Sequence, residues 1–249
     1  MAGAGHRRGP LDGGVVIVVG IETSTPRTSV AVGDGQDILA SISLAGKARQ
    51  ESATPALEYL LGATGLDLAK VAGIAVGVGP GLFTGLRVGV ETAKTLAQVL
   101  HIPIVGLSSL DTLAYAVRHT HKRIAAVIDG RRGEVFFSLY RSVPGGVVRE
   151  TEPAVVKPDG LTAELEAVTE EVLAVGNGAM LYRHELEELK RVEVGTSVSA
   201  HPEAAVLVEL AVPRFLREEF DRPFDIVPLY LRKSDAEIAW DQRARGAQA

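Results

Sequence analysis

Two segments that lie far apart in the chain follow the same pattern, and this repeat limits the folds that the chain can adopt. In residues 15–32 an apolar run ends at Glu22, a short polar turn follows, and a second apolar run returns. Residues 123–140 repeat that order around Asp129. Apolar runs joined by a short polar turn predict β-hairpins. Two unrelated hairpins, each with a solvated acid in its turn, would give the same pattern because acids are common in turns.

Helical and strand-like segments alternate through the rest of the chain. Between the hairpins the predicted order is a helix from about Thr54, strand 74–76, helix 83–100, strand 102–107 and a helix from Ser108. After the second hairpin it is helix 159–169, strand 172–175, glycine loop 176–179 and helix 203–217. This alternation predicts an α/β protein of two subdomains, residues 15–117 and 118–240, between a disordered leader at 1–14 and a flexible tail at 241–249.

The composition is that of an ordinary globular protein, with 46% apolar and 23% charged residues in a chain of 249. A net charge of −5 provides no general attraction for nucleic acid, so any RNA contact is expected to depend on a partner. The absence of cysteine excludes disulfides, thiol nucleophiles and thiolate metal sites, and it suits a cytoplasmic location. No segment approaches the ~20 apolar residues of a membrane span, so no membrane association is expected.

The most unusual segment is Gly77 to Lys94, where five glycines and a proline separate a strand-like run from an amphipathic helix. Glycine lets another group approach the backbone closely, and the first turn of a helix offers free N–H groups to an anion. The spacing nevertheless matches neither the Rossmann nor the Walker A phosphate motif. Gly81, Gly85 and Gly89 recur every four residues, as in helices that pack closely on one another. This glycine row predicts either contact with a partner helix or a tight fit against the chain's own sheet.

Residues that could catalyse a reaction are scarce. Only two of the six histidines, His119 and His121, are close in sequence, and their spacing points them in different directions on a helix. The chain has no G-x-S-x-G nucleophile elbow and no zinc-binding H-E-x-x-H motif. The two hairpin acids, Glu22 and Asp129, remain as candidates for a catalytic site. The two hairpins resemble those that flank the nucleotide cleft in actin- and sugar-kinase-type proteins, and this resemblance implies that the two acids would help to hold magnesium.

Six motifs, in the order of the chain, carry a resemblance to a known family. They are Gly-Ile-Glu-Thr-Ser-Thr (20–25), Gly-Val-Gly-Pro-Gly-Leu-Phe-Thr-Gly-Leu-Arg-Val-Gly (77–89), Ala-Lys-Thr-Leu-Ala (93–97), Ile-Pro-Ile-Val-Gly-Leu-Ser-Ser-Leu (102–110), Ile-Asp-Gly-Arg-Arg-Gly-Glu-Val-Phe (128–136) and Pro-Leu-Tyr-Leu-Arg (228–232). From about Val16 to Trp240 the chain resembles the TsaB (YeaZ) family of bacterial tRNA-modification proteins. The resemblance implies an ASKHA fold, the actin-like and ribonuclease H-like architecture of two α/β subdomains, and a paralogous relation to TsaD.

The resemblance also implies a function. TsaD transfers a threonylcarbamoyl group to adenosine 37 of tRNAs that read ANN codons, which forms threonylcarbamoyladenosine (t6A), and TsaB-type proteins are its non-catalytic partners. The chain is thus expected to be a pseudoenzyme scaffold that binds TsaD, works with the ATPase TsaE, forms a homodimer when alone and meets tRNA only through the complex. TsaD-type proteins hold a metal with two histidines on the first helix, whereas residues 49–56 contain none. No metal or other cofactor is therefore expected.

Two sets of residues are predicted to make the functional contacts. The family packs its first helix and the helix after the glycine row against a partner, and the interface predicted here consists of Leu57, Leu61, Gly81, Phe83, Gly85, Leu86, Arg87 and Gly89. Arg87 is expected to make a polar or charge-paired contact across it. The alternative function is a weak nucleotide-binding or nucleotide-hydrolysing ASKHA protein that takes ATP or ADP with magnesium. Its candidate contacts are Glu22, Thr23, Asp129, Gly130, Gly176 and Gly178.

Overall fold

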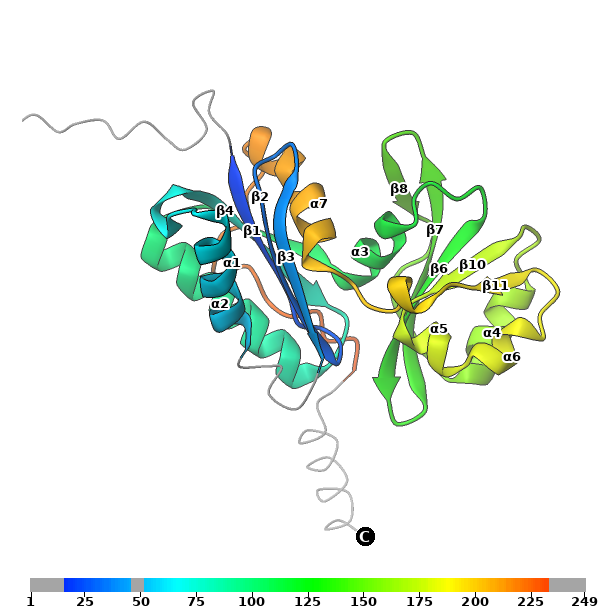
Figure 1. Cartoon of the computed structure of the whole chain (residues 1–249). Helices are drawn as coiled ribbons and strands as arrows, with labels where there is room; N and C mark the ends of the chain where they lie inside the picture. Colours follow the sequence, from blue (N-terminus) through cyan, green and yellow to red (C-terminus); the bar gives the residue numbers. More distant parts are fainter. Residues whose placement is uncertain (1–15, 46–51, 233–249) are drawn as a thin grey trace, which may run out of the picture.

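The computed structural model describes residues 16–45 and 52–232, which form two β-sheets flanked by helices (Figure 1). The predicted leader at 1–14 and tail at 241–249 lie outside these residues. The first sheet has the order β3-β2-β1-β4-β5, with β1 (Ile17–Glu22), β2 (Arg27–Gly33), β3 (Ile38–Ala45), β4 (Val71–Gly79) and β5 (Ile104–Ser108). The second has the order β11-β10-β6-β7-β8, with β6 (Arg123–Arg131), β7 (Glu134–Val143), β8 (Gly146–Arg149), β10 (Val172–Val175) and β11 (Val192–Val194), while β9 (Ala154–Val156) pairs with β7.

Both sheets follow the same strand plan. In the first sheet, β1, β2 and β3 form an antiparallel meander, and β4 and β5 run parallel to β1. In the second, β6, β7 and β8 form the meander, and β10 and β11 run parallel to β6. Both predicted hairpins are confirmed, with Glu22 at the end of β1 opposite Ser29 and Asp129 near the end of β6 opposite Val135. The shared plan favours a repeated unit over two unrelated hairpins.

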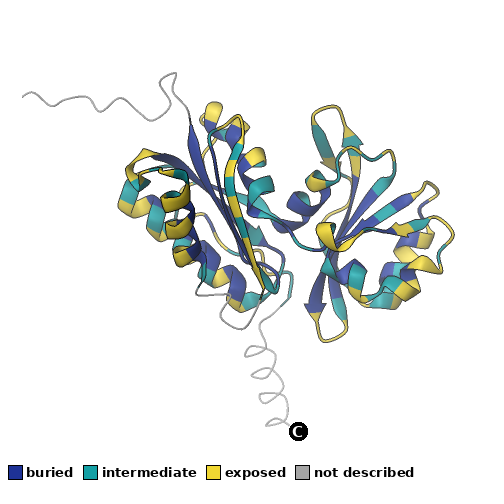
Figure 2. Ribbon diagram, viewed as in Figure 1, coloured by how far each residue is buried: buried dark blue, intermediate teal, exposed yellow. Residues whose placement is uncertain are grey.

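The helices cover the faces of the two sheets. α1 (Ala53–Thr64) and α2 (Phe83–Leu100) bury their apolar residues against one face of the first sheet. α3 (Ser109–Ala116) lies between the sheets and packs Leu110 and Leu113 against β6. The second sheet carries α4 (Pro158–Glu166), α5 (Asn177–Leu181) and α6 (Arg183–Glu187). Figure 2 shows buried strands between helices whose outer faces are exposed. None of the helices in these ranges combines the length and apolar character needed to cross a membrane.

The last helix, α7 (Ala204–Leu216), follows the second sheet in sequence but packs on the first. Leu207, Val208 and Phe215 contact the face opposite α1 and α2, in a cluster with residues of β1, β4 and β5. The predicted assignment of residues 118–240 to the second subdomain is therefore wrong for this helix. The physical reason is that β1 is buried along its whole length on both faces, so the first sheet needs a helical cover on each side. We call the first sheet with α1, α2 and α7 the first lobe, and the second sheet with α3, α4, α5, α6 and the turns between its elements the second lobe.

The chain after α7, residues 217–232, connects the two lobes, and we call it the C-terminal segment. It first pairs with the edge of β5 through an isolated bridge. The backbone N–H of Leu229 then donates to the carbonyl oxygen of Val78 at 2.7 Å. At its end, Arg232 forms an ion pair of 2.7 Å with Glu134 of β7. The segment is thereby fixed to the first lobe at one end and to the second lobe at the other (Figure 1).

Candidate functional site

The glycine row, with Gly81 just before α2 and Gly85 and Gly89 within it, packs against the chain's own β1–β2 turn. A Cβ atom on Gly81 would meet the carbonyl oxygen of Ser24, and one on Gly85 would meet the carbonyl oxygen of Thr23. An added Cβ on Gly89 would meet the hydroxyl of Thr23, which donates to the carbonyl of Gly85 at 2.7 Å. The three glycines therefore let α2 approach the β1–β2 turn closely. The structure supports the alternative, a tight fit within the chain: Gly85 and Gly89 are buried and cannot meet a partner, whereas Gly81 is half-buried and its place in a partner interface stays a prediction.

Gly77 makes room for the carboxylate of Glu22, which a Cβ at that position would meet. Glu22 is fully buried, and its carboxylate accepts hydrogen bonds from the N–H of Ser24 at 2.7 Å and from the hydroxyl of Ser109 at 2.9 Å. Burial raises the pKa of Glu22 above its ordinary value, and the hydrogen bonds to the ionised form oppose this rise only in part. Glu22 thus joins β1, β4 and the start of α3, and it has no exposed surface to offer a metal ion.

The second acid, Asp129, is also engaged by its own chain. Its carboxylate accepts a hydrogen bond from the N–H of Arg131 at 2.8 Å and lies 3.2 Å from the Arg131 guanidinium. The N–H of Asp129 donates to the side-chain oxygen of Asn177, which begins α5, at 3.2 Å. Within residues 16–45 and 52–232 no group of three or more His, Asp or Glu side chains is placed to hold a metal. Asp129 is therefore held in place by Arg131 of its own turn and by Asn177 of α5.

The glycines predicted to contact a nucleotide have packing roles. Gly176 precedes α5 with a φ of 104°, in the left-handed region that favours glycine. A Cβ on Gly176 would meet the carbonyl oxygen of Val127, and one on Gly178 would meet the Val127 side chain at 2.8 Å. The loop predicted at 176–179 is in fact the start of α5, packed closely on β6. Gly130 lies where the pairing of β6 with β7 is irregular. The hydroxyl of Thr23, another predicted nucleotide contact, is hydrogen-bonded to Gly85 of α2.

The outer faces of α1 and α2 are exposed. Tyr59 on α1 is 67% exposed and Val99 on α2 is 70% exposed, large values for such side chains. A Cβ placed on Gly62, in α1, would meet nothing within 4 Å, so the backbone of that helix can be approached closely from outside. Figure 2 shows these two helices exposed on the side away from the sheet. We call this surface the α1–α2 outer face.

The predicted interface residues divide between the core and the surface. Leu57 and Leu86 are buried and therefore cannot meet a partner, which corrects their prediction as contacts. Leu61 and Phe83 are half-buried, and Arg87 is exposed. Sequence reasoning missed the exposed residues of the outer face named above. Their signal was available, because each lies on the side of its helix away from the apolar stripe.

Phe83, Arg87 and Tyr230 form a cluster where α2 begins, which we call the Arg87 cluster. The central guanidinium carbon of Arg87 lies 4.0 Å from the centre of the Phe83 ring, and its Nε donates to the Tyr230 hydroxyl at 3.0 Å. The two rings are 4.9 Å apart. Tyr230 belongs to the C-terminal segment, so this contact joins residues that are distant in sequence. The sequence signalled Tyr230 only as part of a motif, without indicating what it contacts.

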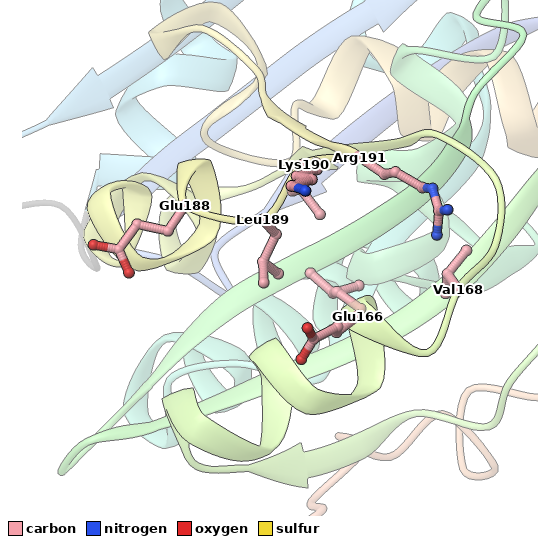
Figure 3. A pocket seen from close by; sticks show the side chains of 8 residues that line it. Glu166, Val168, Glu188, Leu189, Lys190 and Arg191 are labelled. Atoms are coloured by element: carbon pink, nitrogen blue, oxygen red, sulfur yellow. The ribbon is translucent and has the colours of Figure 1, made fainter.

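A separate hollow of about 350 Å³ lies in the second lobe, near the ends of α4 and α6 (Figure 3). It is lined by Leu165, Glu166, Val168, Glu188, Leu189, Lys190, Arg191 and Val192. Figure 3 shows the carboxylate of Glu188 directed away from the guanidinium of Arg191. Ligand sites combine concave walls with a few convergent polar groups, and this convergence is missing here. None of the predicted site residues lines this hollow.

The two lobes share one strand plan, and each begins with a hairpin whose first strand ends near an acid. This arrangement defines the ASKHA class of proteins, which have the actin-like architecture. Component A of the (R)-2-hydroxyglutaryl-CoA dehydratase from Acidaminococcus fermentans, of the same class, has a TM-score of 0.50 at 12% identity. The match covers 80% of this chain and 98% of that protein, and at this identity it shows the fold alone. The predicted fold class is confirmed.

Comparison with related sequences identifies the family within this class. A family model described as "TsaD: tRNA N6-adenosine threonylcarbamoyltransferase" matches residues 42–240. The tRNA threonylcarbamoyladenosine biosynthesis protein TsaB of Bacillus subtilis (strain 168) is 32% identical over 90% of this chain and 97% of that protein. YeaZ from Pseudomonas aeruginosa has a TM-score of 0.73 at 26% identity, over 87% of this chain and 100% of its own. This chain belongs to the TsaB (YeaZ) family, whose Bacillus subtilis member is named for the biosynthesis of threonylcarbamoyladenosine in tRNA.

Proposed function

We propose that the chain is a non-catalytic partner of a TsaD-type threonylcarbamoyltransferase and supports t6A formation through its surface. The observation that carries the proposal is the α1–α2 outer face, where Tyr59 is exposed one turn from the open backbone of Gly62 on α1 and Val99 is exposed on α2. A surface with large apolar side chains and room for close helix approach is typical of one that another protein covers. The match of the chain to a TsaD family model supports a partner of related fold.

The described acids support the non-catalytic part of the proposal. Glu22 is fully buried and hydrogen-bonded within the chain, and Asp129 is paired with Arg131. Residues 49–56, which match the metal-binding segment of TsaD-type proteins, contain no histidine. We therefore assign the transfer chemistry to the partner. A contribution of TsaE, a homodimer in the absence of the partner and a cytoplasmic location stay predictions of the family resemblance.

Replacement of Tyr59 by arginine tests the interface. Because Tyr59 is exposed, the substitution should leave the fold intact while placing a charge on the outer face. We expect Tyr59→Arg to abolish binding to the TsaD-type protein of the same organism in calorimetry, and to abolish t6A formation on unmodified tRNA. Val198→Arg is the matched control, since Val198 is 86% exposed in the second lobe. If Tyr59→Arg binds the partner as tightly as Val198→Arg, this surface is not the interface.

Replacement of the two acids tests whether the chain takes part in the chemistry. Asp129→Asn and Glu22→Gln keep the shapes of the side chains and remove their charges. In variants that are folded by circular dichroism and bind the partner normally, we expect the rate of t6A formation at saturating partner to be unchanged. A variant that binds the partner but fails to support t6A formation would assign a chemical role to this chain.

A further inference from the structure

We infer that the Arg87 cluster is the docking point for a carboxylate of the partner protein. The inference rests on the proposed function and names the chemistry of one contact within it. Two properties of Arg87 carry the inference: its side chain is held rigidly, and its terminal guanidinium nitrogens are unpaired in the described part of the chain. A rigid, unpaired cation on the surface is prepared for an anion from outside.

The rigidity of Arg87 comes from contacts on two sides. The face of its guanidinium stacks on Phe83, and Nε is bound by the Tyr230 hydroxyl. Tyr230 is itself fixed, because Leu229 before it donates to the Val78 carbonyl and Leu231 after it packs against the core of the second lobe. A free arginine side chain loses conformational freedom when it binds a partner, which opposes binding. The Arg87 side chain has already lost most of its conformational freedom when the chain folds, so binding costs it little more.

The charge of Arg87 is unmatched by any carboxylate among residues 16–45 and 52–232. Most arginines in those ranges form ion pairs, as Arg118 does with Glu209 at 3.2 Å. An acid is present one turn further along α2, but Glu91 is bound to Lys94 at 3.1 Å. The Nη1 and Nη2 atoms of Arg87 thus keep the fork of donors that binds a carboxylate through two parallel hydrogen bonds.

The surroundings of the cluster favour a protein carboxylate over a nucleic-acid phosphate. The C-terminal segment close to Tyr230 in sequence exposes Phe224 by 82%, Val227 by 64% and Leu229 by 36%. Surfaces that bind the phosphate backbone gather several cations, because affinity grows with each phosphate neutralised. Protein hot spots instead combine arginine and tyrosine with apolar neighbours. Arg87 lies between two aromatic rings and next to an apolar segment, which is the composition of a protein hot spot.

Calorimetric titration of the full chain with the TsaD-type protein tests the inference. Arg87→Ala should raise the Kd by about thirtyfold, the scale of a hot-spot truncation. Arg87→Lys, which keeps the charge but loses the planar fork, should raise it by about tenfold. Tyr230→Phe keeps the ring and removes only the hydroxyl that holds Nε, and should raise the Kd by about fivefold, the scale of one hydrogen bond. Arg191→Ala, an exposed arginine outside the cluster, should bind as the wild type does.

The outcomes separate this inference from the function on which it rests. If the wild type fails to bind the TsaD-type protein, the proposed function is wrong. If the wild type binds and Arg87→Ala binds equally well, only the docking inference is overturned. If Arg87→Ala keeps its affinity for the partner but weakens tRNA binding by the assembled complex, the anion is a phosphate and the carboxylate assignment is wrong. Rescue of Arg87→Glu by lysine at one acidic position of the partner would support the inference and identify the carboxylate.

Discussion

Replacing Gly85 with alanine should destabilise the fold, although alanine is the better helix former by about 1 kcal/mol. The added methyl group would meet the carbonyl oxygen of Thr23, a backbone atom that no change of side-chain rotamer can move. Overpacking of this kind costs ~1–3 kcal/mol. Moving α2 outward would also break the hydrogen bond from Thr23 to Gly85, worth ~1 kcal/mol. The free energy of unfolding should therefore fall by ~1–3 kcal/mol once the propensity gain is subtracted.

Gly62→Ala is the matched control for this prediction. Gly62 is also a helical glycine, but a Cβ there meets nothing, so only the propensity gain applies and the fold should be stabilised by up to ~1 kcal/mol. Urea unfolding followed by circular dichroism measures both changes. Opposite signs at the two positions are the expected result. If Gly85→Ala proves as stable as the wild type or more stable, α2 does not pack on the β1–β2 turn through this glycine, and the partner-facing interpretation of the row returns.

Two ionisable groups, the fully buried Glu22 and the half-buried His201, give pH predictions of opposite sign. The pKa of Glu22 in the folded chain is raised above 4.5. The contribution of Glu22 to the free energy of unfolding is therefore fully present below pH 4.5 and is lost as the pH rises through the pKa of the folded state. Glu22→Gln should abolish this contribution. Burial lowers the pKa of His201 from 6.5 to about 4. The contribution of His201 to the free energy of unfolding is therefore present above pH 6.5 and is lost as the pH falls toward 4. His201→Gln should remove this contribution. Urea unfolding at a series of pH values measures both, and a pH dependence identical to that of the wild type would contradict the prediction for that residue.

The elements that the sequence predicted are those whose signal is local. The hairpins, α1, α2 and β10 follow from apolar runs, helical spacing and the proline near the start of α1. β3 was missed because its inner residues are Ile38, Ala40 and Ile42 while its outer ones include Leu39, so its alternation is weak. α7 was predicted as a helix but placed with the wrong sheet. Helical spacing identifies an apolar face without identifying the sheet that covers it.

The candidate site depended on contacts with no local signal. A spacing of four places Gly85 and Gly89 on one face of α2, but it does not say whether that face meets the same chain or a partner. The answer lies in the backbone carbonyls of Ser24 and Thr23, which have no sequence signature. The partner of Arg87 within the chain, Tyr230, is even more distant in sequence. The glycines predicted that some group approaches the backbone of this segment closely. Only the three-dimensional structure identifies that group as the β1–β2 turn.

The glycine row also determines which side of α2 faces outward, although the glycines themselves do not form that outer surface. In α2 the inner stripe holds Gly85, Gly89 and Ala93, all buried, so Arg87 and Val99 must lie on the outer side. Any group that pushes α2 away from the β1–β2 turn also moves Arg87 relative to the C-terminal segment, which is anchored elsewhere. Substitutions in the row should therefore lower both stability and partner affinity, whereas Arg87→Ala, which leaves the packing of α2 on the turn unchanged, should lower mainly the affinity. Measuring both quantities for both kinds of variant distinguishes residues that shape the interface from those that form it.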